Sequence, residues 1–209
     1  MKQVLKHGMI GFGVSFVGSL PLGYLNLLGF QFLLHEGWLA TIQYLMGVLG
    51  IELIVIYVTL MFVNVLAQNQ RLMKRIAFFA MLFMLGMALL FFFSTLEKRT
   101  VPLIIYGSPL LTGLVCSALN VAQIPFWTGW NLNLLASERI QLQGKFTFSY
   151  IAGCGIGTFL GMISLIFLLN HAVATLDSLQ YYLSKIVMPL LFCGLAIFQV
   201  IRLYRMRSV

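Results

Sequence analysis

A single glutamate, Glu52, lies near the middle of an apolar stretch, residues 40–66, that carries no other charge. An acidic residue at the centre of a membrane helix costs about 2.5 to 3.5 kcal/mol on insertion scales. Such a residue therefore points to a function in the bilayer. It could carry a proton, bind the ammonium group of a solute, or hydrogen-bond inside a helix bundle in a structural role, and the sequence leaves these roles open.

Two other apolar stretches contain residues that interrupt helices. In the first, Pro21 removes a backbone donor and Gly23 loosens the chain beside it, with Asn26 one turn further on. In the second, the amides of Asn120 and Gln123 precede a proline. Backbone groups freed inside the bilayer need partners, so each break could bind a polar solute or be a kink that serves packing alone.

Trp127 follows the second break, where it could anchor the helix at the membrane interface or line an inner vestibule. A later stretch spaces Gly153, Gly157 and Gly161 four residues apart, which makes one helix face small enough for close packing. We expect Glu52 to handle the proton or cation. The solute site that we predict contains Pro21, Gly23, Asn26, Asn120, Gln123 and Trp127.

Six apolar segments of membrane-crossing length must position these residues, namely 8–34, 40–66, 76–96, 109–136, 146–170 and 182–204. The first is interrupted at residues 19–23 and the fourth at residues 120–125. Of the 209 residues, 61% are hydrophobic and 9% charged, whereas soluble domains have about 45–50% and about 25%. We therefore predict an all-α integral membrane protein with six transmembrane helices in a single domain, residues 1–209, whose first and fourth helices are broken.

The two halves of the chain, residues 1–100 and 101–209, share a pattern. Each begins with an interrupted span. The run from Gly47 to Glu52 in the second span has a counterpart from Gly153 to Thr158 in the fifth span, 106 residues later. Because a unit of three spans reverses the orientation of the next unit, we predict two inverted-topology three-helix repeats, a pattern that points to a transporter site.

The net charge of +8 reflects basic residues at segment ends, which predicts membrane topology rather than nucleic-acid binding. With six spans, the side of both termini carries Lys2, Lys6, Arg71, Lys74, Arg75, Arg139, Lys145, Arg202, Arg205 and Arg207. The opposite side carries only Lys98, Arg99 and Lys185. Since cytoplasmic loops hold the basic excess, we expect both termini in the cytoplasm.

Enzymatic, metal and redox functions find no support in the sequence. It contains no Ser-His-Asp set, HExxH motif or P-loop, and its three histidines are scattered near segment ends. The cysteines Cys116, Cys154 and Cys193 form no CxxC pair, and Cys116 has no partner in the first span with which to form a thiol relay. We predict no enzyme activity, no cofactor and no metal.

The pattern resembles the LysE-type (lysine exporter) superfamily of bacterial amino-acid exporters. The residues that carry the resemblance are Pro21, Gly23, Asn26, Gly37, Gly47, Gly50, Glu52, Gly113 and Asn120, within six spans. The resemblance implies an exporter in the inner membrane of a bacterium, whose translocation path passes near Pro21, Glu52 and Asn120. The chain is a divergent member, because Pro21-Leu22-Gly23 stands where the family has Pro-Gly-Pro, and Asn120-Val121-Ala122 where it has Asn-Pro-Lys. The lysine of the family's Asn-Pro-Lys motif is absent here, which removes a positive charge from the expected site. The resemblance therefore does not imply that this chain exports lysine or arginine.

We therefore expect a secondary transporter that exports a small polar solute, first of all an amino acid or a derivative, driven by protons or the membrane potential. The alternative is a non-transporting membrane scaffold or accessory subunit. It would explain the short loops and glycine packing but not two matched breaks beside a lone carboxylate. The expected partners are the solute and the lipid bilayer, and a homo-oligomer is compatible with the sequence.

Overall fold

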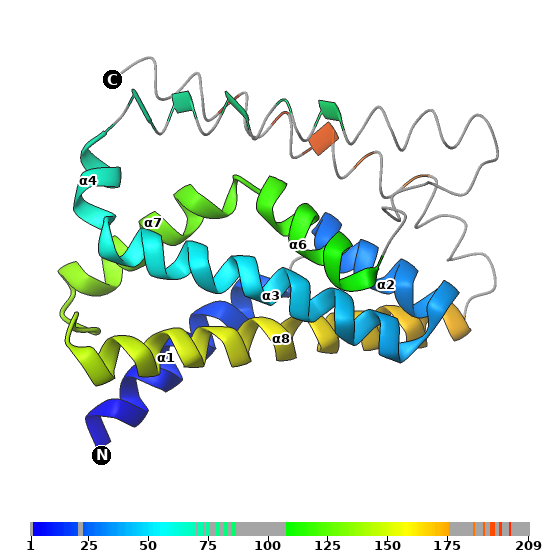
Figure 1. The fold of residues 1–209 in the computed structure, drawn as a ribbon, viewed down its shortest axis with the longest axis horizontal. Coiled ribbons are helices and arrows are strands. Elements are labelled where there is room, and N and C mark those ends of the chain that lie inside the picture. The colour runs from blue at the N-terminus through cyan, green and yellow to red at the C-terminus, as the bar shows by residue number, and fades with distance from the viewer. Residues whose placement is uncertain are drawn as a thin grey trace.

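The computed structural model describes residues 2–20, 23–69 and 108–175, together with isolated positions within 71–86 and 186–201. Pro21 and most of the predicted third and sixth spans lie outside the described residues. Every element within the described ranges is a helix (Figure 1). The elements are α1 (Lys2–Ser19), α2 (Tyr24–Glu36), α3 (Trp38–Met61), α4 (Val63–Gln68), α6 (Pro109–Leu119), α7 (Gln123–Ala136) and α8 (Gly144–Thr175).

Two of these helices, α3 and α8, are each long and apolar enough to cross a membrane. The pairs α1–α2 and α6–α7 are long and apolar enough to cross a membrane only when each pair is taken together. The two helices of a pair meet at a bend, of 76° between α1 and α2 and of 68° between α6 and α7. The described residues thus provide two membrane-length helices, or four spans if each bent pair counts as one. The prediction that the first and fourth spans are broken is confirmed.

Local sequence explains where the breaks fall. Gly23 has extended backbone angles (φ −107°, ψ 162°) and precedes the first turn of α2. In the second break α6 ends at Leu119 and α7 begins at Gln123, so the break covers residues 120–122 rather than the predicted 120–125. Pro125 lies in the first turn of α7, where its missing N–H has no intrahelical acceptor to lose.

The predicted second span is also divided, into α3 and α4, at Phe62. The Thr59 hydroxyl, three residues earlier, donates to the carbonyls of Val55 and Ile56 at 2.7 and 3.1 Å. Hydroxyls that bond backward onto their own helix favour bending. The connection to the preceding helix is tight, because Gly37 between α2 and α3 has a left-handed φ of 82° and donates its N–H to Phe32 and Leu33.

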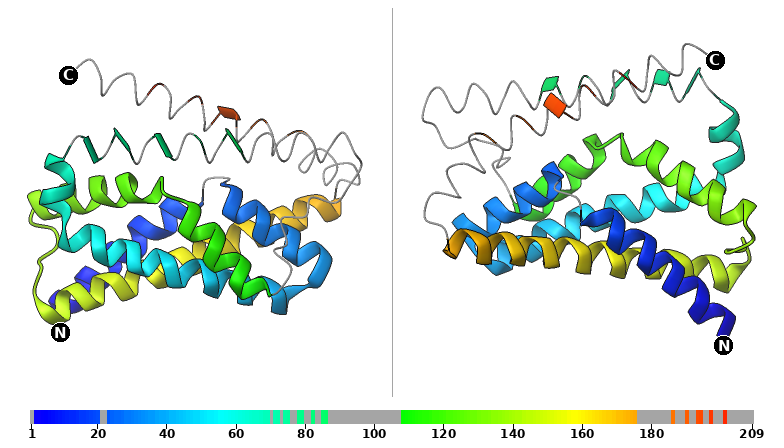
Figure 2. Two further views of the ribbon diagram at one scale, coloured as in Figure 1. Left: turned by 45° about the horizontal axis from the view of Figure 1, so that its top comes forward. Right: turned by 180° about the vertical axis from the view of Figure 1, so that it is seen from behind.

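Two crossed helix pairs form the centre of the bundle, α1 with α8 and α3 with α6 (Figure 2). Glycines bring the backbones together in both pairs. A methyl group added to Gly153 of α8 would collide with the carbonyl oxygen of Gly8, and one added to Gly113 of α6 would collide with that of Tyr44.

The other two glycines of the α8 series lie against the same helix. A methyl group at Gly157 would meet the backbone of Phe12, and one at Gly161 would meet the backbone of Phe16. Small residues at this spacing allow dispersion contacts and backbone approach without a hydrophobic driving force from water. The glycine face of α8 therefore packs on α1 along three successive turns.

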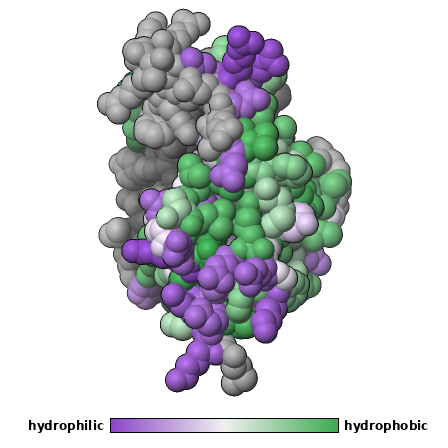
Figure 3. Space-filling model, turned by 90° about the vertical axis from the view of Figure 1, so that its left-hand side faces the viewer, coloured by the Kyte–Doolittle hydropathy of each residue, from purple (hydrophilic) through white to green (hydrophobic). Residues whose placement is uncertain are grey.

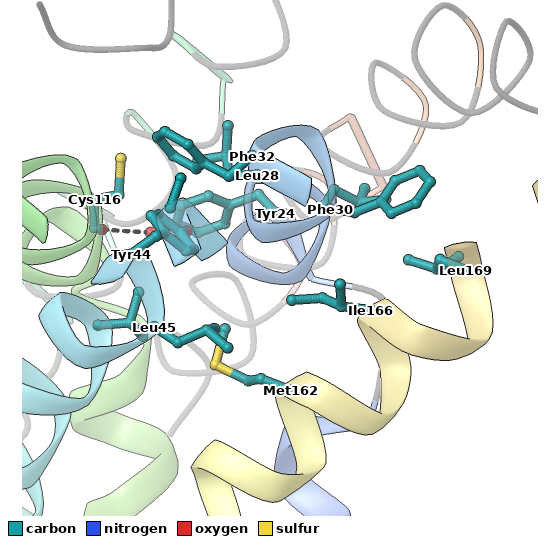
Figure 4. Close-up of a cluster of buried hydrophobic side chains, with 13 residues drawn as sticks. Tyr24, Leu28, Phe30, Phe32, Tyr44, Leu45, Cys116, Met162, Ile166 and Leu169 are labelled. Atoms are coloured by element: carbon teal, nitrogen blue, oxygen red, sulfur yellow. Dashed lines mark hydrogen bonds between the residues drawn. The ribbon is translucent and has the colours of Figure 1, made fainter. Parts of the chain in front are cut away.

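Two apolar clusters fill the bundle. The α2-end cluster contains chiefly Tyr24, Phe30, Phe32, Tyr44, Met162 and Ile166, from α2, α3 and α8 (Figure 4). The α7-end cluster contains Ile56, Leu60, Trp127, Leu134, Tyr150 and Cys154, from α3, α7 and α8. Each cluster packs one half of a broken span against the two continuous helices.

Polar and basic residues gather at the end where α1 begins. The ring of His7 donates from Nδ1 to the Gln3 carbonyl (2.7 Å) and accepts at Nε2 from the backbone N–H of Gln141 (3.1 Å). These bonds hold the start of α1 beside the loop between α7 and α8. Figure 3 views this end, where hydrophilic side chains surround an apolar centre. Lys2 and Lys6 thus share one end of the bundle with Arg139 and Lys145.

Candidate functional site

Glu52 lies at the boundary between the two apolar clusters. On α3 it is one turn from Val48, which belongs to the α2-end cluster, and one turn from Ile56, which belongs to the α7-end cluster. Residues four apart share a helix face, so Glu52 projects toward the same interior as these two side chains. Its side chain is half-buried, which leaves part of it accessible.

Neutral donors hold the Glu52 carboxylate. The Thr158 hydroxyl of α8 donates to Glu52 Oε1 at 3.2 Å, and the indole of Trp127 in α7 lies within hydrogen-bonding reach of the same carboxylate. Among the described residues, no basic side chain forms an ion pair with Glu52. In the described part of the chain, the hydrogen-bond partners of this carboxylate are thus neutral.

A third helix joins this site through a second hydroxyl. Ser15 of α1 is hydrogen-bonded to the Thr158 hydroxyl, and both side chains are buried. Ser15, Thr158 and Glu52 thus connect α1, α8 and α3 at one level of the bundle. Sequence reasoning did not single out either hydroxyl residue as functional.

The first break is stabilised from within the chain. Asn26, the third residue of α2, donates from Nδ2 to the carbonyl of Ser19 at the end of α1 (2.9 Å). The Tyr44 hydroxyl of α3 donates to the neighbouring carbonyl of Leu25 (3.0 Å). Asn26 therefore bonds to the protein's own backbone across the break, although the sequence predicted it as a solute ligand.

The second break has a similar arrangement. Gln123, the first residue of α7, donates from Nε2 to the carbonyl of Ser117 near the end of α6 (2.9 Å). Asn120 caps the end of α6, and its backbone N–H also donates to Ser117. Asn120 and Gln123 do not share an intact helical turn, because the helix stops between them.

Trp127 is 1% exposed and belongs to the α7-end cluster, beside Glu52. The Trp127 ring is therefore packed inside the bundle. Trp130, one turn later, is 42% exposed and faces outward. Of the predicted solute ligands, the structure thus brings Trp127 to Glu52, whereas Asn26 and Gln123 lie at their own breaks and Pro21 falls outside the described residues.

A second buried polar group, missed as a functional candidate by sequence reasoning, crosses the α7-end cluster. Asn131 of α7 accepts from the Tyr150 hydroxyl at 2.9 Å and donates to the Thr59 hydroxyl at 3.2 Å. All three side chains are buried, and they connect α8, α7 and α3. A polar residue in an apolar helix was the only sequence signal for this group.

Among the described residues, no group of three or more histidine, cysteine, aspartate or glutamate side chains could hold a metal ion. The two buried cysteines, Cys116 and Cys154, are free thiols. No family model, curated protein or solved structure matches this chain.

Proposed function

We propose that the chain is a secondary transporter of a bacterial inner membrane that exports a small polar solute, first of all an amino acid or a derivative. Export is coupled to protons or to the membrane potential. One observation carries this proposal: a lone carboxylate, Glu52, is held by neutral donors where α1, α3 and α8 meet, between two broken spans. A resemblance to LysE-type exporters is part of the same proposal.

The arrangement of the two halves supports inverted repeats. Tyr44 and Tyr150, like Glu52 and Thr158, are separated by 106 residues. Each tyrosine donates its hydroxyl to the second part of the broken span of its own half, at Leu25 of α2 and Asn131 of α7. In the inverted repeat that we propose, Glu52 and Thr158 are equivalent residues that meet at the pseudo-two-fold axis.

Helix packing follows the same rule in both halves. A methyl group at Gly11 of α1 would meet the Tyr150 carbonyl on α8, and a methyl group at Gly113 of α6 would meet the Tyr44 carbonyl on α3. Each first half-span therefore packs on the continuous helix of the other repeat. Transporters with inverted repeats have their sites at the repeat interface near the bilayer midplane, and we propose this position for Glu52.

The two clusters support alternating access. The α2-end cluster lies on one side of Glu52, and the α7-end cluster lies on the other. Opening one cluster at a time exposes the carboxylate to one side of the membrane, where it takes up a proton or the ammonium group of a solute. We assign the α7 end to the cytoplasm, because the basic residues at the start of α1 and in the loop after α7 lie there.

One observation favours the alternative, a non-transporting scaffold or accessory subunit. Asn26 and Gln123 both use their amide nitrogens to bridge the ends of their own broken helices, as a purely structural kink would require. The two proposals differ in what they predict for Glu52, because a scaffold has no need of a solute at that carboxylate.

Ligand-induced stabilisation separates the two. Purified protein is heated with a panel of amino acids and their amide and decarboxylated derivatives, and the unfolding temperature is recorded. We expect one chemical class to raise it in the wild type, to lose this effect in Glu52→Gln, and to keep it in Glu138→Gln, whose carboxylate is exposed. If no solute stabilises the wild type, or if Glu52→Gln responds equally, the scaffold is favoured.

A further inference from the structure

The hydrogen bonds around Glu52 have a direction that its ionisation imposes. An ionised carboxylate only accepts hydrogen bonds, so the Thr158 hydroxyl must donate its proton to Glu52. The Thr158 oxygen is then free to accept, and the Ser15 hydroxyl bonded to it must be the donor. The charge on Glu52 thereby orders a relay that runs from Ser15 through Thr158 to the carboxylate.

A separate pair of hydrogen bonds joins α1 to the first break. The Ser19 hydroxyl donates to the Ser15 carbonyl one turn earlier (2.8 Å), and the Ser19 carbonyl accepts from the Asn26 amide across the break (2.9 Å). Both acceptors are backbone carbonyls, so these bonds fix the end of α1 against the start of α2 and are not part of the relay of hydroxyls that ends at Glu52. The second half has a different arrangement, since Ser117 donates to the backbone carbonyl of Val48.

We propose that Ser15 and Thr158 are positioning residues that link the protonation state of Glu52 to the α1–α8 pair. This inference deepens the proposed transport function and rests on it. A hydrogen bond to a charged acceptor is roughly twice as strong as one between neutral groups. Proton uptake by Glu52 therefore weakens the bond from Thr158 and removes the fixed direction of the relay, which releases α1 and α8 from α3.

Within the described helices, few other ionisable groups lie near Glu52. On α8 the nearest titratable side chain is Cys154, with Tyr150 one turn earlier. On α6 Cys116 belongs to the α2-end cluster, together with Tyr24 of α2. Helix α7 has no titratable side chain, and those of α1 lie in its first two turns. The switch that we propose therefore depends on Glu52 itself.

Cys154 provides a built-in reporter, because it is fully buried beside Glu52. We would measure how fast a small maleimide labels Cys154 in the full chain in proteoliposomes, with Cys116 and Cys193 replaced by alanine. A double-mutant cycle of Glu52→Gln and Thr158→Val then tests the link at one pH. We expect each single change to speed labelling about threefold or more, and the double variant to be no faster than the faster single one.

Two further variants guard against trivial explanations. Thr128→Val removes a buried hydroxyl that donates only to the Ile124 carbonyl of its own helix (2.7 Å), and it should leave the labelling rate within about twofold of wild type. Thr158→Ser keeps the hydroxyl and should restore wild-type labelling. If Thr158→Val proves too unstable to purify, Ser15→Ala takes its place in the cycle.

The inference is overturned if the two changes act independently, or if Thr158→Val labels like Thr128→Val. Maleimide labelling requires no solute, so the double-mutant cycle tests the relay whether or not the protein transports a solute. Proton-driven efflux with an additive cycle would refute the relay alone. A coupled cycle without efflux would refute the transport function and leave the contact between Glu52 and Thr158 as a structural one.

Discussion

Replacing Gly153 with alanine should force α8 away from α1. The new methyl group would meet the carbonyl oxygen, carbonyl carbon and Cα of Gly8, all of which belong to the backbone. A flexible side chain can rotate away from such a collision, but a helix backbone cannot. The two helices must therefore separate or shift, and the neighbouring close contact at Gly11 would be disturbed with them.

The size of the effect follows from two opposing terms. Overpacking typically lowers the stability of the fold by about 1–3 kcal/mol, whereas replacing a helical glycine with alanine raises it by about 0.5–1 kcal/mol. Because the obstructing atoms are backbone, we expect the collision to exceed the gain and Gly153→Ala to lose about 1–2 kcal/mol of unfolding free energy. For chains of this size, that loss corresponds to a fall of about 2–8 °C in the unfolding temperature.

Thermal unfolding in detergent, followed by tryptophan fluorescence, measures this change. Gly129→Ala is the matched control, since Gly129 is helical and a methyl group added there has nothing within 4 Å. We expect the control to unfold at the wild-type temperature or slightly above. If Gly153→Ala also unfolds at or above the wild-type temperature, the close approach of α1 and α8 is not as described.

Three further predictions use the same assay. Asn131→Leu removes two buried hydrogen bonds and should lower the unfolding free energy by about 1–2 kcal/mol. Asn133→Leu, on the exposed face of the same helix, is the control and should have little effect. Equal losses in the two variants would contradict a stabilising role for the Asn131 hydrogen bonds. Gln123→Leu leaves the Ser117 carbonyl without its side-chain donor and should cost about 1 kcal/mol, so an unchanged midpoint would rule out that bridge. Tyr44→Phe loses one partly buried hydrogen bond to α2 and should destabilise the protein less than Asn131→Leu does. A larger loss than that of Asn131→Leu would refute this ranking.

The positions of the breaks could be predicted from the sequence because their signals are local. Gly23 and the residues after Asn120 interrupt otherwise apolar runs, and the structure ends and restarts helices there. The extent of the second break was overestimated at Pro125, since a proline is compatible with the first turn of a helix. The continuous helices α3 and α8 were predicted because their apolar runs exceed the length of a membrane crossing.

The hydrogen-bond partners could not be predicted, because they depend on how helices pack. Thr128 and Thr158 both lie in apolar helices, yet Thr128 bonds to its own helix and Thr158 bonds to Glu52 of another. Nothing in the local sequence distinguishes the two hydroxyls. In the same way, Asn26 was predicted to face a solute, but the bend between α1 and α2 brings the Ser19 carbonyl within its reach.

Proton-driven efflux is the most direct test of the transport function. Proteoliposomes are loaded with the solute that stabilises the wild type, and efflux is followed with and without an imposed pH gradient, acidic on the side that receives the solute. We predict that the gradient accelerates efflux through the wild type and has no effect on Glu52→Gln. Efflux that ignores the gradient in both proteins would contradict the role of Glu52 in coupling, and efflux no faster than from protein-free liposomes would contradict transport itself.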